Sequence, residues 1–413
     1  MNDTSFERYI YVRFSWRAGA QTLSVRDINT ADVLIVGGGI AGAGAAYELA
    51  GFASVIVLEG ESRCGYHSTG RSAASFTENY GGAVIRRLAI ASRAFLRDPP
   101  PGFCEHPLLA PRGMITIARE DQLERLAQEL EHARVLVPSI ARIDVPAAIA
   151  RVPILRPDRI AGAFIEPHSM EMDVDALHQG FLRSARAKGA RVVVNAGVRA
   201  IERTGGCWAV TTEAGIFHAP NIVNAAGAWA DIIAQYAGVQ PVGLVPKRRT
   251  AFNVTVPPGM NIGHWPMVND VAEEFYFKPD AGRLLVSPAD ATVSAPMDAY
   301  PEDHDVAVGV ERLESATTLK VHRVSRTWAG LRTFAPDGVP VVGPDGGVDG
   351  FFWLAGQGGY GIKTSPALSR ACASLLRDGR FPEDLTEMGV SAADLSPDRM
   401  RGALAAATTA ISI

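Results

Sequence analysis

Residues Asp32–Gly42 read DVLIVGGGIAG, an apolar run followed by a glycine-rich turn. The run Asp32–Val36 predicts a short parallel strand that is buried on both faces. Small helix-forming residues fill Ala41–Leu49, and Ser54–Leu58 (SVIVL) predicts a second strand. Strand, glycine loop, helix and strand in this order begin a doubly wound α/β sheet.

The glycines of this turn match the pattern GxGxxG, and each has a physical reason. Gly37 permits the tight turn, Gly39 lets the backbone approach a pyrophosphate, and Gly42 lets helix and strand pack closely. Glu59 ends the second strand, where a carboxylate accepts hydrogen bonds from an adenosine ribose. The alternative is a glycine-rich turn without a ligand. The predicted dinucleotide residues are Gly37, Gly39, Ala41, Gly42, Glu59 and Gly60.

A second glycine-rich loop near the C-terminus indicates which dinucleotide is bound. Gln357–Thr364 (QGGYGIKT) follows an apolar strand, and Thr364 or Ser365 can cap a helix whose first position suits Pro366. The helix amides and Lys363 would stabilise negative charge at N1–C2=O of a reduced flavin, although a solvated lysine is the alternative. The predicted flavin residues here are Gly358, Gly359, Tyr360, Gly361, Ile362 and Lys363.

Composition is that of a soluble globular enzyme, with 413 residues, 47% of them hydrophobic and 20% charged. A net charge of −4 gives no electrostatic reason to expect a nucleic-acid partner. The four cysteines are scattered, so we expect reduced thiols and no metal site. We find no membrane-spanning stretch and no signal peptide, which favours a cytoplasmic location. We interpret residues 1–30 as an extension outside the fold.

The remaining chain predicts a discontinuous two-domain organisation. Val174–Lys188 is an amphipathic helix ahead of Gly189, and 241–328 is strand-like except near Val308–Thr317. Further strands are expected at Arg191–Asn195, Cys207–Thr211, Asn221–Asn224, Val339–Val342 and Phe351–Ala355. The predicted cofactor domain comprises 31–104, 168–235 and 329–400, and the substrate domain comprises 105–167 and 236–328.

Seven longer motifs carry a family resemblance. They are Gly65–Ala74 (GYHSTGRSAA), Phe103–Leu109 (FCEHPLL), Asp175–Gly180 (DALHQG), Val223–Trp229 (VNAAGAW), Pro246–Arg249 (PKRR), Trp328–Arg332 (WAGLR) and Gly350–Ile362 (GFFWLAGQGGYGI). With them the chain resembles the D-amino-acid oxidase group of flavoproteins, and most closely bacterial D-arginine dehydrogenase. The resemblance implies a glutathione-reductase-type Rossmann domain that binds FAD, and a substrate domain built on an antiparallel sheet.

The resemblance also implies further cofactor residues. Ser68–Ser75 would wrap the pyrophosphate and flavin, with Arg71 serving either phosphate or structure, and the backbone of Val198 would meet the adenine. Thr333 stands where sarcosine oxidase has the cysteine that binds flavin covalently, so noncovalent FAD is expected. The cofactor residues added in this way are Ser68, Thr69, Gly70, Arg71, Ser72, Ala73, Ala74, Ser75, Val198, Ala226, Gly227 and Gly330.

The implied substrate site holds the carboxylate of a small amino acid. Arg332 and Arg249 match the family's carboxylate binders, and Tyr276 and Tyr80 match tyrosines that hydrogen-bond the substrate. For Arg249 the alternative is a solvated Lys-Arg-Arg face. Hydride would pass from Cα of a D-amino acid to flavin N5, and water would hydrolyse the imine to a 2-oxo acid and ammonia. His67 in the flavin loop is interpreted as structural.

Two departures from the D-arginine enzymes bear on the substrate. Ser75 replaces a histidine, and Gly113–Met114 lacks the glutamate that would pair with a guanidinium, so uncharged side chains are expected. Two alternatives stay open: an N-methylated or cyclic secondary amine as substrate, such as sarcosine or proline, and a non-catalytic flavin-binding subunit. The electron acceptor, whether oxygen, quinone or another, is open as well.

Overall fold

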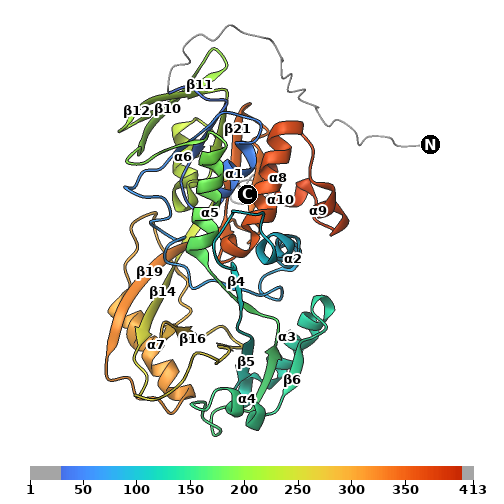
Figure 1. Ribbon diagram of the computed structural model, residues 1–413, viewed down its shortest axis with the longest axis vertical. Helices are drawn as coiled ribbons and strands as arrows, with labels where there is room; N and C mark the ends of the chain where they lie inside the picture. The colour runs from blue at the N-terminus through green and yellow to red at the C-terminus, as the bar shows by residue number, and fades with distance from the viewer. Residues whose placement is uncertain (1–28, 402–413) are drawn as a thin grey trace, which may run out of the picture.

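The computed structural model describes residues 29–401, which form two stacked halves joined by long strands (Figure 1). The expected N-terminal extension lies outside the described residues except for its last two positions. Thr30 pairs with His218, so the described chain starts against the upper half.

The upper half contains a six-stranded sheet in the order β20-β21-β13-β1-β2-β9. All neighbours are parallel except β20 and β21, which confirms the doubly wound sheet expected from the sequence. Its strands are β1 (Val33–Val36), β2 (Val55–Leu58), β9 (Arg191–Val193), β13 (Asn221–Asn224), β20 (Val341–Pro344) and β21 (Phe351–Ala355).

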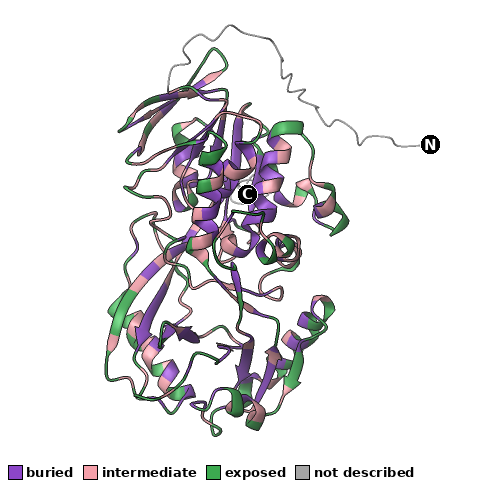
Figure 2. Ribbon diagram, viewed as in Figure 1, coloured by how far each residue is buried: buried purple, intermediate pink, exposed green. Residues whose placement is uncertain are grey.

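Both faces of this sheet are covered, which is why β1, β2 and β21 are apolar at every position. Val33 and Ile35 pack with helices, whereas Leu34 and Val36 pack with a three-stranded sheet and α6 on the other side. Buried residues are concentrated in these layers in Figure 2. The covering elements are α1 (Ile40–Leu49), α2 (Ala83–Arg97), α5 (Val174–Ala187), α6 (Ala230–Tyr236), α8 (Gly361–Asp378), α9 (Glu383–Glu387), α10 (Ala392–Leu395), η2 (Gly227–Trp229), β10 (Val198–Thr204), β11 (Cys207–Thr212) and β12 (Gly215–Ala219).

The lower half contains a ten-stranded sheet in the order β22-β19-β14-β17-β16-β15-β5-β7-β6, with β18 added against β14. Its pairs are antiparallel apart from β15 with β5, so the antiparallel second layer is confirmed. The elements are β5 (Met114–Ala118), β6 (Ala141–Ile143), β7 (Gly162–Glu166), β14 (Val245–Val254), β15 (Met267–Asp270), β16 (Tyr276–Asp280), β17 (Arg283–Ser287), β18 (Thr292–Val293), β19 (Val324–Phe334), β22 (Gln357–Gly358), η1 (Glu120–Gln122), α3 (Leu123–Leu136), α4 (Val145–Arg151) and α7 (Asp303–Ala316).

Two connections hold the halves together. A small sheet of β3 (Ser75–Phe76), β8 (Met170–Met172) and β4 (Leu109–Pro111) lies between them. Strand β19 runs along β14 and then pairs with β22, where Thr333 faces Gly358. The domain boundary expected at residue 329 therefore falls inside a continuous strand, and the end of β19 reaches the second glycine loop.

Helix α8 begins earlier than the sequence predicts. It starts at Gly361 without a side-chain cap, and Pro366 lies inside it instead of at its first position. Proline lacks the N–H that would bond the carbonyl of Ile362. The Ser365 hydroxyl donates to that carbonyl at 3.0 Å, so the proline is tolerated within the helix. The second glycine-rich segment, Gln357–Thr364, therefore already contains the first turn of α8.

Candidate cofactor and substrate site

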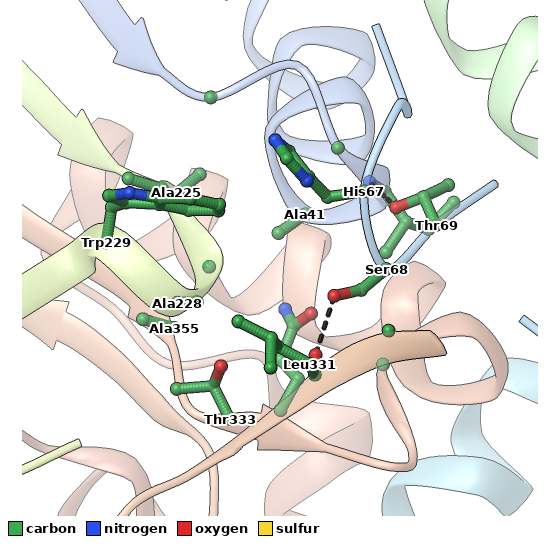
Figure 3. Close-up of a pocket in the computed structure, with 18 of the residues that line it drawn as sticks. Ala41, His67, Ser68, Thr69, Ala225, Ala228, Trp229, Leu331, Thr333 and Ala355 are labelled. Atoms are coloured by element: carbon green, nitrogen blue, oxygen red, sulfur yellow. Dashed lines mark hydrogen bonds between the residues drawn. The ribbon is translucent and has the colours of Figure 1, made fainter. Parts of the chain in front are cut away.

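A cavity of about 460 Å³ lies between the two halves and takes its walls from both. Its size is typical of a small-molecule site. Figure 3 shows Ser68 next to Leu331, to which a dashed line joins it, with Thr333 and Ala355 farther to the left.

Most of the cofactor residues expected from the sequence line this one cavity, including both glycine loops. They are Gly37, Gly39, Ala41, Glu59, Gly60, Ser68, Thr69, Arg71, Ser72, Ala73, Val198, Ala226, Gly227, Gly330, Gly358, Gly359, Gly361 and Ile362. The expected cofactor residues outside the lining are Gly42, Gly70, Ala74, Ser75, Tyr360 and Lys363. The two glycine loops, far apart in sequence, thus meet at one space.

The first turn of α1 lines the cavity, and the 65–73 loop is bonded to it. The Thr69 hydroxyl accepts a hydrogen bond from Ile40 N at 3.0 Å, which ties the 65–73 loop to the first turn of the helix. Gly42 does not line the cavity, because its role is packing: a Cβ there would overlap the carbonyl oxygen of Gly37. Free amides and the helix dipole make this end suitable for phosphate.

Glu59 fixes the shape of the first glycine loop. Its Oε2 accepts from Gly38 N at 2.8 Å, and its Oε1 accepts from Glu61 N at 2.9 Å. Burial raises the pKa of Glu59, and the two amide bonds oppose that rise. Glu59 lines the cavity at the position expected for a ribose contact.

Arg71 has structural partners and also lines the cavity. Its guanidinium donates to Ala299 O and Ala329 O at 3.0 Å and pairs with Asp298. The Ser68 hydroxyl donates to Leu331 O at 2.6 Å (Figure 3). These bonds attach the 65–73 loop to β19 and to the segment before α7, so the cavity wall is closed on that side.

Lys363 requires a correction. Its Nζ donates to Thr77 O at 2.9 Å and to Tyr80 O at 2.7 Å, and its side chain neither lines the cavity nor reaches solvent. Burial lowers the pKa of Lys363 to about 7, with Glu166 acting in the opposite direction. Lys363 therefore donates its hydrogen bonds to backbone carbonyls and does not face the cavity. Of the groups expected to stabilise negative charge on the flavin, only the amides at the start of α8 remain.

The two candidate carboxylate binders lie on one face of the β14–β19 ladder. Lys247 faces Arg332 and Arg249 faces Gly330, so the two arginines are diagonal neighbours, and both line the cavity. Arg248, which lies between Lys247 and Arg249 in the sequence, points to the opposite face of the sheet. There it pairs with Asp305 at 2.8 Å and with Glu302. The Lys-Arg-Arg run is therefore not a uniform solvated face.

Positive charge at this place has no ion-pair partner within residues 29–401, and Asp290 only partly opposes the fall in the pKa of Arg249. Neither Arg249 nor Arg332 has a carboxylate within ion-pair distance there, and Arg249 Nε lacks a hydrogen-bond partner. Burial, together with the Arg332 charge, lowers the pKa of Arg249. Because two half-buried guanidinium groups in one cavity wall repel each other, an anion between them is favoured.

The tyrosines complete this end of the cavity. Tyr276 lines it and packs in an apolar cluster with Ala251, Met267 and Leu285, against which Met114 also packs. Tyr80 does not line the cavity; its ring lies 5.1 Å from that of Tyr360. Burial raises the pKa of Tyr360 to about 12.

Gly359 gives Arg332 its space. A Cβ at Gly359 would lie 2.9 Å from Arg332 Nη1, closer than side-chain atoms approach each other. Arg332 therefore lies directly against the second glycine loop, which explains why this position carries no side chain.

Several lining residues were not selected from the sequence. His67 lies 2.9 Å from Glu61 and its ring is 4.7 Å from that of Trp229, so it is held as a structural group in the wall (Figure 3). His67 lies in the GYHSTGRSAA motif and Trp229 in the VNAAGAW motif, so membership of these motifs could have identified both as lining residues. Thr333, which the family resemblance placed beside the flavin, also lines the cavity. Others that sequence reasoning missed are Tyr66, Ala225, Ala228, Ile232, Ile233, Tyr236, Leu331, Leu354, Ala355, Gly356 and Gln357.

Two absences hold for the described part of the chain. It contains no group of three His, Cys, Asp or Glu side chains that could hold a metal, and all four cysteines are unpaired. Its helices include none that combines the length and apolar character needed to span a bilayer.

Comparison with known sequences gives a consistent picture. A family model described as "FAD dependent oxidoreductase" matches residues 32–375. Rat mitochondrial dimethylglycine dehydrogenase is 24% identical, covering 87% of this chain and 44% of that protein. Human mitochondrial sarcosine dehydrogenase is 27% identical, covering 86% and 41%. N-methyl-L-tryptophan oxidase of Salmonella arizonae is 25% identical, covering 87% and 98%. The chain spans less than half the length of the two mitochondrial relatives.

Solved structures share the fold. Glycine oxidase from Geobacillus kaustophilus superposes with a TM-score of 0.76 at 23% identity, covering 87% of this chain and 98% of that chain. L-Proline dehydrogenase from P. horikoshii gives 0.76 at 20% identity, covering 91% and 99%. Iminodiacetate oxidase from Chelativorans sp. BNC1 gives 0.73 at 22% identity, covering 88% and 98%. None of these relatives is a D-arginine dehydrogenase, so they do not support that closer likeness.

Proposed function

Since this chain belongs to the family of FAD-dependent oxidoreductases, we propose that it oxidises a C–N bond of a small amino acid held by its carboxylate. The observation that carries the proposal is the pair of cavity-lining guanidinium groups, Arg249 and Arg332, which have no carboxylate partner among residues 29–401. A substrate carboxylate supplies the missing negative charge.

The residues present fit FAD. The α1 start offers free amides for phosphate, and at Gly39 the nearest atom to an added Cβ would be Thr69 Oγ1 at 3.3 Å. The α8 start offers a second set of amides across the cavity, at Gly359 and Gly361. FAD, when bound, accepts two electrons from the substrate as a hydride.

The protein's own contribution is positioning. Arg332 and Arg249 would orient the substrate through its carboxylate, and the Tyr276 hydroxyl is available for a further hydrogen bond. His67 is the one histidine in the described lining, and Glu61 engages it. No side-chain base is therefore assigned, and the substrate amine would lose its proton to solvent before the hydride leaves.

For the substrate we place an N-substituted amino acid first, because the relatives are named for dimethylglycine, sarcosine and N-methyltryptophan. A D-amino acid with an uncharged side chain is the second candidate. The apolar cluster of Ala251, Met267 and Leu285 around Tyr276 favours it, with Met114 packed beside this cluster.

An anaerobic bleaching panel tests the proposal. The FAD-loaded protein is mixed with sarcosine, dimethylglycine, L-proline and both enantiomers of alanine, methionine and arginine, and loss of flavin absorbance is followed. Formaldehyde as product identifies oxidation at an N-methyl group, and ammonia identifies oxidation of a primary amine. A non-catalytic flavin-binding subunit would retain its colour with every member of the panel.

D-Arginine should be a poor substrate. The acidic residues of the described lining are Glu59 and Glu61, and both are engaged by backbone amides or His67. D-Arginine would bring a third guanidinium into a site that already holds two, so we expect kcat/KM at least about tenfold below that of a neutral D-amino acid. Steady-state rates with D-arginine and D-methionine check this, and a higher value for D-arginine would reverse it.

FAD should be held noncovalently. Thr333 lines the cavity, and all four cysteines lie in the described region without lining it. A threonine hydroxyl is a much weaker nucleophile than a thiolate. Acid precipitation should therefore leave a white pellet and a yellow supernatant; flavin absorbance that stays in the washed pellet would contradict this.

A further inference from the structure

A single carboxylate, that of Asp298, contacts the side chains of three residues in the cavity wall. The Tyr66 hydroxyl donates to its Oδ2 at 3.1 Å, and the Arg71 guanidinium pairs with its Oδ1. His67 Nδ1 lies 3.9 Å from the same Oδ1. Tyr66, His67 and Arg71 all line the cavity, whereas Asp298 does not. Asp298 therefore acts on the cavity through these three neighbours.

The segment that carries Asp298, residues 294–301, lies between β18 and α7 of the lower half. The 65–73 loop follows β2 of the upper half, so the carboxylate joins the two halves beside the cavity. Ala299, the next residue, is buried in an apolar cluster and accepts a hydrogen bond from Arg71 at 3.0 Å. The 294–301 segment is thus anchored to the protein and can hold the loop in place.

The 65–73 loop has little apolar surface of its own to fix its position. Ser68, Gly70 and Ser72 are small and exposed. A segment with few buried apolar contacts opens at a low cost in free energy. Polar contacts such as those with Asp298 therefore decide how often this part of the cavity wall moves.

Asp298 is suited to this role because it stays charged at neutral pH. Burial raises its pKa, but the hydrogen bonds from Arg71 and Tyr66 outweigh burial, and the pKa lies below its ordinary value. The Asp298 side chain is 34% exposed, so solvent screens the ion pair and weakens it. The contact is therefore strong enough to slow the loop and weak enough to open.

The loop keeps two other attachments, both to β19. The Ser68 hydroxyl donates to Leu331 O at 2.6 Å, and Trp328 Nε1 donates to Arg71 O at 3.0 Å. Loss of the Asp298 carboxylate should therefore loosen the loop without detaching it, and the fold should persist.

We propose that Asp298 is a positioning residue for the cofactor: it holds the 65–73 loop against the 294–301 segment and thereby slows the release of FAD. Thr69 in the same loop is bonded to Ile40 N at the start of α1, so movement of the loop would open the cavity at its phosphate end. The inference rests on the proposed function in placing FAD in this cavity, and it is independent of the substrate.

The rate of FAD release from the loaded protein tests the inference. The protein is diluted into buffer without FAD, and the FAD that stays bound is measured at intervals after gel filtration, as the ratio of flavin to protein absorbance. We expect Asp298→Ala to release FAD about tenfold faster than the wild type, because an ion pair and a hydroxyl contact are lost. Asp298→Asn keeps an oxygen acceptor without the charge, so its rate should lie between the two. If Asp298→Ala does not fold, Asp298→Asn carries the same comparison.

Asp305→Asn is the matched control. Asp305 pairs with Arg248 at 2.8 Å on the face of the sheet that points away from the cavity. Its substitution also removes the charge of an acid paired with arginine, yet FAD release should stay within about twofold of the wild type. Equal release rates for Asp298→Asn and Asp305→Asn would overturn the inference.

A double-mutant cycle tests the route through Tyr66. In the wild type, Tyr66→Phe should speed FAD release about threefold, because a donor to Asp298 is lost. In the Asp298→Ala background the same change should add less than about 1.5-fold, since the acceptor is already absent. Equal effects in the two backgrounds would show that the hydroxyl acts without Asp298, and this route would be wrong.

The outcomes separate this inference from the proposed function. If no amine bleaches the flavin but Asp298→Ala releases FAD faster than Asp305→Asn, the proposed oxidation fails and the positioning role stands. If an amine bleaches the flavin and all variants release FAD at the wild-type rate, the proposed function stands and the positioning role fails.

Discussion

Arg332→Met is expected to lower kcat/KM by about 100- to 1,000-fold while FAD remains bound. Removing one member of a hydrogen-bonded charge pair costs about 2–5 kcal/mol, and the expected loss, about 3–4 kcal/mol, lies within that span. Arg332 lies in the cavity wall against Gly359, so methionine fills similar space without the two parallel donors. The loss should fall mainly on KM, because the guanidinium binds the carboxylate in the ground state as well as in the transition state.

Arg248→Met is the matched control. Arg248 precedes Arg249 on β14 but faces the other side of the sheet, where it pairs with Glu302 and Asp305. Its loss should reduce thermal stability modestly and leave kcat/KM within about threefold. If Arg332→Met stays within tenfold of the wild type, the carboxylate is anchored elsewhere.

Gly42→Ala is expected to prevent retention of FAD. The added Cβ would overlap the carbonyl oxygen of Gly37. The backbone fixes the positions of both atoms, so α1 must move away from the first glycine loop. Overpacking of this kind costs about 3 kcal/mol, equivalent to roughly 100-fold weaker cofactor binding. The ratio of flavin to protein absorbance after purification, and the thermal unfolding temperature with and without added FAD, measure the effect.

Gly51→Ala provides the comparison at the other end of α1. Nothing lies within 4 Å of a Cβ at Gly51, so the substitution adds the same atom without a clash. This variant should purify yellow and unfold at or slightly above the wild-type temperature, because alanine restricts the unfolded chain. A Gly42→Ala protein as yellow and as stable as Gly51→Ala would show that close packing at Gly42 does not support the cofactor site.

Local sequence was sufficient for the cofactor half. Val33–Val36 and Val55–Leu58 are apolar at every position because the sheet is covered on both faces, and that pattern is visible without coordinates. The glycine spacing of 37–42 is equally local, since the turn, the phosphate approach and the helix contact all involve neighbouring residues. Strand, loop, helix, strand order and the family motifs therefore led to FAD directly.

Side-chain direction was not available from the sequence wherever long-range register sets it. Arg248 and Arg249 are adjacent and chemically identical, and the pairing of β14 with β19 alone turns one outward and the other into the cavity. Lys363 and Arg71 have their partners at Thr77, Tyr80 and Asp298, segments that only folding brings near. A buried cation takes whichever acceptor the packed chain presents to it, and no spacing within its own segment reveals which acceptor that is.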